Sequence, residues 1–186
     1  MRANPLIALA VLLVLYAGLF LPKNKTAIKG ITNNIPSWEE VPEMQEILGD
    51  DQTKRLLAAR RLVERVDVEA ALEILENSPL AHDGEGHLAV HQIGFYAYQK
   101  YGFESILKCK DYFLYACYHG TIIEAASDQG FEGIISMSEK CRGTFPRFFQ
   151  CAHAVGHSLL AMWNYDLPNA LKDCDKIYEN EKDFPE

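Results

Sequence analysis

The stretch GFEGIISMSEKC, residues 130–141, repeats the pattern of GFESILKC, residues 102–109. Both stretches begin with Gly-Phe-Glu, continue through a short apolar run and end in Lys-Cys. A third stretch, DLPNALKDC at residues 166–174, keeps this layout with Asp-Leu-Pro in place of Gly-Phe-Glu. Self-similarity of this kind is typical of repeat architectures. The sequence therefore predicts an internal repeat.

A longer segment that carries histidine precedes each of these stretches. The three segments are HLAVHQIGFYAYQKY (87–101), CYHGTIIEAASDQ (117–129) and CAHAVGHSLLAMWNY (151–165). Their first histidines recur at intervals of 32 and 34 residues, within the range of helix-turn-helix repeats. Upstream, residues 51–66 and 67–78 have the spacing of amphipathic helices, with Asp67 as the expected N-cap of the second. The predicted fold is all-α: an array of helix-turn-helix repeats with corners closed by disulfides.

The N-terminus carries an uncharged apolar run from Leu6 to Leu21, which is typical of an export or membrane segment. No well-formed cleavage site follows, so we expect an uncleaved single-pass anchor in preference to a cleaved signal or a buried helix. The following domain is expected outside the cytoplasm, although the lysines after the run favour keeping it inside. The predicted division is an anchor over 1–22, a juxtamembrane linker over 23–42 and an all-α repeat domain over 43–186. We expect this domain to stop inside a repeat.

The five cysteines lie in the second half of the chain, and behind an export segment they are expected to form disulfides. On one unbroken helix Cys109 and Cys117 would stand about 12 Å apart, too far for a disulfide, whereas a helix-loop-helix corner brings such positions together. The repeat thus predicts the pairs Cys109–Cys117 and Cys141–Cys151 and leaves Cys174 unpaired. A competing interpretation is a closed Cys2His2 zinc site made of Cys117, His119, Cys151 and His153.

Histidines at equivalent places of the repeat are the candidate metal ligands. Residues four apart on a helix project from one face, so each pair in HLAVH and HAVGH can hold one ion with two imidazoles. The predicted ligands are His87, His91, His119, His153, His157 and Glu124, with His82 as a group that orients His87. Imidazole-rich ligation suits iron, copper or zinc and does not suit calcium or magnesium. The competing interpretation is that these histidines only help the helices to pack.

Other chemistries find little support in the residues. The net charge of −8 and the absence of a basic stripe argue against nucleic-acid binding. Neither HLAVH nor HAVGH has the glutamate that a zinc protease of the HExxH type uses as its base. The chain has no CxxCH motif for haem and no CxxC redox pair. Each Cys-x-His pair is two residues apart and points to different sides of a helix, which disfavours a cysteine nucleophile.

Two functions follow from these patterns. The first is an exported, membrane-anchored helical domain that carries a histidine-ligated transition metal, with no residue pattern to decide between oxidative and hydrolytic chemistry. The second is a disulfide-stapled scaffold that binds a protein partner on the face of the repeat array and has no catalytic activity. In both cases residues 6–21 are expected to contact the membrane.

Overall fold

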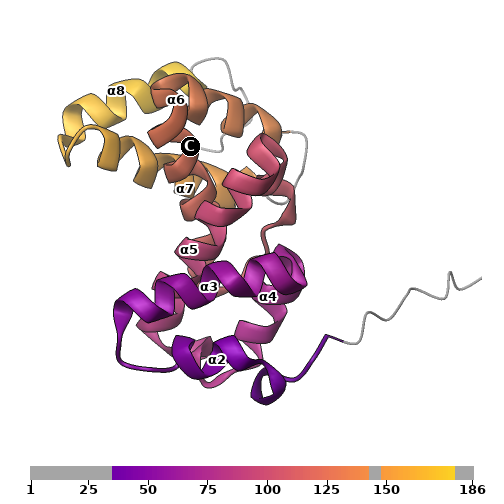
Figure 1. Ribbon diagram of the computed structural model, residues 1–186. Coiled ribbons are helices and arrows are strands. Elements are labelled where there is room, and N and C mark those ends of the chain that lie inside the picture. Colours follow the sequence, from indigo (N-terminus) through magenta and orange to yellow (C-terminus); the bar gives the residue numbers. More distant parts are fainter. Residues whose placement is uncertain (1–34, 143–147, 179–186) are drawn as a thin grey trace, which may run out of the picture. The chain divides into compact units, whose positions relative to one another are not determined.

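The computed structural model describes residues 35–142 and 148–178, which belong to one compact unit, Ile35–Glu186. The described residues form helices and contain no strand, so the all-α prediction is confirmed for this part of the chain (Figure 1). Within it, no helix combines the length and apolar character that crossing a membrane requires. The predicted anchor over 6–21 lies outside the described residues, and the anchor stays a prediction.

The first group of helices comes from the residues before the histidine-bearing segments. It consists of η1 (Trp38–Glu40), α2 (Pro42–Ile47), α3 (Gln52–Val66), α4 (Val68–Glu76) and η2 (Pro79–His82). Val41, which we expected in the linker, is 1% exposed and belongs to the core. The compact unit that contains Val41 begins at Ile35, and the predicted division of the chain stays a prediction.

The second group contains the candidate ligands. It consists of α5 (Gly84–Tyr101), η3 (Gly102–Lys108), η4 (Phe113–Tyr115), α6 (Ala116–Arg142), α7 (Phe148–Met162) and α8 (Leu167–Tyr178). Helix α5 packs against α3 and α4 on one side and against α6 on the other (Figure 1). Its apolar residues Ala89, Val90 and Ile93 are completely buried. Helix α5 thereby connects the first group of helices to the rest of the second group.

Helix starts follow the expected capping rule at two places and depart from it at a third. Asp51 caps α3 by accepting a hydrogen bond from Lys54 N (3.1 Å), and Asp83 caps α5 by accepting one from Glu85 N (3.0 Å). Asp67 stands at the N-cap of α4 as predicted, but its side chain makes no cap hydrogen bond. Its carboxylate instead accepts a hydrogen bond from Tyr101 OH (2.5 Å), and so ties the end of α5 to the α3–α4 corner.

Two glycines open the Gly-Phe-Glu stretches with the same backbone geometry. Gly102, which ends α5, has φ 55° and ψ −138°, and Gly130, where α6 kinks, has φ 62° and ψ −141°. Residues with a side chain rarely adopt this conformation, which explains glycine at both places. The matching turns are in line with the predicted repeat, and the repeat stays a prediction.

Both predicted disulfides are present. Cys109–Cys117 joins the end of η3 to the start of α6, with the Cα atoms 5.5 Å apart, and Cys141–Cys151 joins the end of α6 to α7, with the Cα atoms 6.2 Å apart. The alternative Cys2His2 zinc site is excluded, because the sulfurs of Cys117 and Cys151 are already bonded. Cys174 is free and half-buried on α8.

We expect one free thiol per chain when the full chain is denatured without reductant and titrated with a thiol reagent. Two disulfides consume four of the five cysteines, so the remaining thiol belongs to Cys174. The variant Cys174→Ser should therefore show none. A control sample that is reduced first should show five in the parent chain, and finding five without reduction would contradict both disulfides.

Candidate metal centre

Five histidines from three helices form one cluster. His87 and His91 come from α5, His119 comes from α6, and His153 and His157 come from α7. They form two groups of three, in each of which one ring nitrogen per residue lies within 4.8 Å of the others. His87, His91 and His119 make the inner group, and His119, His153 and His157 make the outer group. His119 belongs to both.

The inner group brings three ring nitrogens to one place. His91 Nε2 lies 2.9 Å from His87 Nε2 and 3.2 Å from His119 Nδ1. His87 Nδ1 donates a hydrogen bond to the carbonyl oxygen of Phe113 (2.7 Å). This hydrogen bond places the ring proton of His87 on Nδ1 and leaves the lone pair of Nε2 directed at the cluster, as in many metal-binding histidines.

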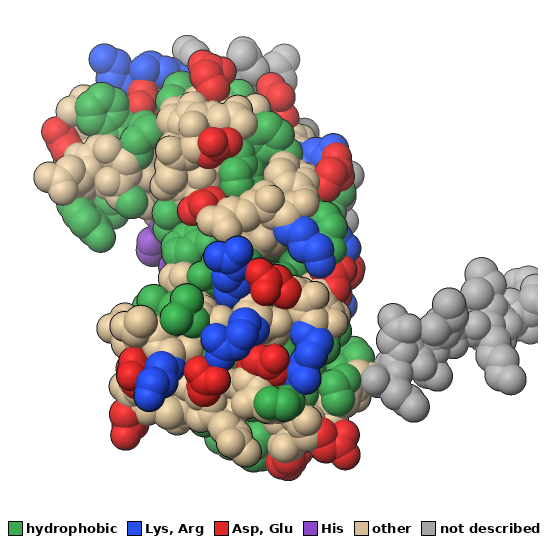
Figure 2. All heavy atoms as spheres, in the orientation of Figure 1, with side chains coloured by type: hydrophobic (Ala, Val, Ile, Leu, Met, Phe, Trp, Pro, Cys, Tyr) green, Lys and Arg blue, Asp and Glu red, His purple; other side chains and the backbone are tan. Residues whose placement is uncertain are grey.

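The outer group is more open to solvent. His153 and His157 are exposed on α7, whereas His119 is 4% exposed. The ring centroid of His119 lies 5.0 Å from that of His153 and 4.7 Å from that of His157. On the face shown in Figure 2, acidic and basic side chains are interspersed and histidine is visible only in a recess. The cluster is thus partly sheltered, with α7 forming its accessible side.

The second nitrogen of His119 has no hydrogen-bond partner. His119 Nε2 is buried, and no donor or acceptor among the described residues satisfies it. Leaving a buried polar atom without a partner costs about 1–3 kcal/mol, and such atoms are uncommon in folded proteins. A ligand bound at this nitrogen would satisfy the atom.

Burial keeps the imidazoles of His91 and His119 neutral. Burial first, and then the neighbouring histidines, because a second positive charge is unfavourable there, lower the pKa of His91 to about 4 and that of His119 to about 3. Burial and the same neighbours also lower the pKa of His157. A neutral imidazole has the free lone pair that metal coordination requires.

A left-handed turn before α6 aims the Phe113 carbonyl at His87. Phe113, Leu114 and Tyr115 have φ values of 51°, 51° and 65°. This conformation costs about 1–2 kcal/mol per residue for side chains other than glycine. The turn lies inside the loop that the Cys109–Cys117 disulfide closes. Nothing in the sequence signals this turn, so sequence reasoning missed the carbonyl of Phe113 as part of the site.

Contact between α5 and α6 sets the distance between His91 and His119. A Cβ atom added at Gly120 would overlap the carbonyl oxygen of His91, and one added at Gly94 would overlap the carbonyl oxygen of Cys117. The two backbones therefore touch, beside the histidines that converge. The glycines in HQIG and CYHG are the sequence signal for this contact, which the spacing of the histidines alone does not predict.

Glu124 and His82 are the two other residues predicted for the site. Glu124 belongs to neither group, and its Oε1 accepts a hydrogen bond from Gln99 Nε2 (2.8 Å) near the surface. His82 ends η2, and its side chain lies outside the described residues. The group that orients His87 in the structure is the carbonyl of Phe113.

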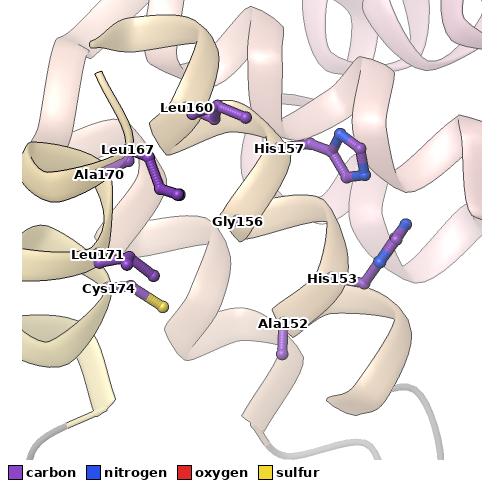
Figure 3. A pocket seen from close by; sticks show the side chains of 9 residues that line it. All are labelled: Ala152, His153, Gly156, His157, Leu160, Leu167, Ala170, Leu171 and Cys174. Carbon is purple, nitrogen blue, oxygen red and sulfur yellow. The ribbon is translucent and has the colours of Figure 1, made fainter. Parts of the chain in front are cut away.

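An apolar groove adjoins the outer group between α7 and α8. It has a volume of about 350 Å³, and its lining includes His153, His157, Leu171 and Cys174. Figure 3 shows the two imidazoles pointing away from α8 on one side of α7, and the side chains of Leu171 and Cys174 extending from α8 on the other side. Gly156, between the two histidines on α7, has no atom within 4 Å of an added Cβ.

We expect Gly120→Ala to destabilise the protein by about 1–3 kcal/mol, because the added methyl group meets the backbone of α5. Gly156→Ala is the matched control: the space there is open, so the helix preference of alanine should raise stability by up to about 1 kcal/mol. Denaturant unfolding of the metal-free chain measures both. Equal stability of the two variants would contradict a tight contact between α5 and α6.

No protein family, curated protein or solved structure matches this chain. Its donor set consists of five imidazoles, and neither group includes a carboxylate or a thiolate among the described residues. Neutral imidazole ligands suit zinc, copper and iron. With zinc such a site activates water, and with copper or iron it can transfer electrons.

Proposed function

We propose that this protein is an exported, membrane-anchored helical-repeat protein that binds a transition metal, with iron, copper and zinc as the candidate ions. The proposed ligands are His87, His91, His119, His153 and His157. One observation carries the proposal: three ring nitrogens of the inner group converge, and the hydrogen bond to Phe113 O directs one of them.

The spacing of these nitrogens fits a coordination shell. Two imidazole nitrogens that bind one tetrahedral ion at about 2.0–2.1 Å are about 3.3 Å apart. The separations at His91 Nε2 are 2.9 Å and 3.2 Å. Because the neutral form of His91 prevails at pH 7, a cation between the rings can take the place of the hydrogen bond between His91 Nε2 and His87 Nε2 and bind both nitrogens.

Export and anchoring are supported by the sequence and by the disulfides. The apolar run over residues 6–21 is typical of a segment that enters a membrane. Two disulfides favour a compartment that is oxidising. We therefore propose that the histidine domain lies outside the cytoplasm.

The repeat supports the ligand assignment. Gly102 and Gly130 follow the first and second histidine-bearing helices with the same φ and ψ, and the disulfides lead into the second and third. A repeat that stacks its helices side by side places equivalent residues on one face. Histidines at equivalent places on adjacent helices thus meet in one cluster.

A protein-interaction scaffold is the alternative, and one observation favours it. Leu167 and Leu171 on α8 are 54% and 55% exposed beside the α7–α8 groove. Exposed apolar side chains in a cluster are a common feature of surfaces that bind partners. Metal content separates the two functions, because the scaffold needs no ion.

We expect the full chain, purified in detergent from a metal-replete culture, to contain at least one zinc, copper or iron ion per chain. Elemental analysis measures the content. His91→Gln and His119→Gln should weaken binding by at least about tenfold, because each removes a ligand of the inner group. Chelation should lower the melting temperature, and returning the ion should restore it.

Glu124→Gln is the matched control, because Glu124 lies on the same helix as His119 and outside both groups. It should keep the metal content of the parent chain. The proposal fails if the parent chain holds less than about 0.3 ion and its melting temperature does not respond to zinc, copper or iron.

A further inference from the structure

The five imidazoles do not form a single ligand shell. Nitrogens that can share one ion lie within 4.8 Å of one another only inside the inner group and inside the outer group. His119 is the one residue common to both among those described. A single ion therefore uses one group and leaves a pair of histidines from the other helix unused.

The ring of His119 lies between the two histidine pairs at similar distances. Its centroid is 5.6 Å from that of His87 and 5.2 Å from that of His91 on α5. The corresponding distances to His153 and His157 on α7 are 5.0 Å and 4.7 Å. No other histidine of the cluster has this position.

The two nitrogens of His119 have different surroundings. Nδ1 faces the inner group, 3.2 Å from His91 Nε2. Nε2 is buried and has no partner among the described residues. The lone pairs of these two ring nitrogens diverge, so one imidazole cannot use both on the same ion.

We propose that the centre holds two metal ions at once and that His119 bridges them as an imidazolate. Nδ1 binds the ion that His87 and His91 hold, and Nε2 binds the ion that His153 and His157 hold. The inference rests on the proposed function and adds the number of ions and the group that connects them. The ions it suits are divalent copper, or copper with zinc, because both accept three nitrogen ligands and leave a position open.

The charge and proton balance of the bridge is simple. Neutral His119 carries one ring proton and one lone pair. The first ion takes the lone pair, and the second ion takes the other nitrogen by displacing the ring proton, which passes to solvent. No oxidant or reductant is involved, and both ions keep their oxidation state.

Titration of the metal-free full chain with divalent copper tests the bridge. We expect two copper ions per chain by elemental analysis. Two cupric ions joined by an imidazolate pair their spins and lose their electron paramagnetic resonance signal at low temperature. With one equivalent of copper per chain, the signal should account for nearly all the copper. With two equivalents, most of the signal should be lost. Unfolding the sample in acid with a chelator should restore the signal of all the copper, which excludes reduction as the cause of the loss.

His119→Gln keeps both histidine pairs and removes the bridge, so any copper it binds should give its full signal. The Glu124→Gln variant should lose its copper signal at two equivalents, as the parent chain does. One copper per chain, or two with a full signal in the parent chain, would overturn the bridge and leave the proposed metal site intact. No bound copper, zinc or iron in the parent chain would overturn both.

Discussion

The contact between α5 and α6 is the constraint on which the rest of the site depends. The helix backbones touch at Gly94 and Gly120, and the residues next to this contact are the ones that meet in the inner group. His119 follows Tyr118, which is fully buried, so α6 cannot rotate without disturbing the core. The distance of 3.2 Å between His119 Nδ1 and His91 Nε2 is therefore set by packing, before any ligand binds.

The two disulfides add a second constraint, on the loops that enter α6 and α7. Cys109–Cys117 closes the loop that contains the left-handed turn, and that turn presents the carbonyl of Phe113 to His87. Cys141–Cys151 fixes the start of α7 two residues before His153. Covalent closure limits the freedom of these loops in the unfolded chain and so supports turns whose backbone is strained. Cysteine and histidine thus have separate roles in CAHAVGH: the cysteine positions the helix, and the histidines face the cluster.

Periodic spacing explains why the histidine cluster and the disulfide pairs could be predicted from the sequence. Recurrence of histidine identified His87, His91, His119, His153 and His157, and recurrence of cysteine identified both disulfide pairs. Features that depend on tertiary packing could not be predicted in this way. The carbonyl of Phe113 has no side-chain signature. Glu124 was chosen for its distance along the helix, but its carboxylate accepts a hydrogen bond from Gln99 instead. Asp67 is the predicted cap of α4, but its carboxylate accepts hydrogen bonds from Tyr101, Lys100 and Lys108, which are more than 30 residues away in the sequence.

The central claim, that the cluster is a metal site built before the ion binds, is tested most directly by crystallography of the copper- or zinc-loaded chain at the absorption edge of that metal. The account predicts an anomalous peak within about 2.0–2.3 Å of both His91 Nε2 and His119 Nδ1. It also predicts that the rings of these two histidines hold the positions they have without metal. A metal-loaded crystal with no peak among the five histidines, or with its peak at other side chains, would contradict it.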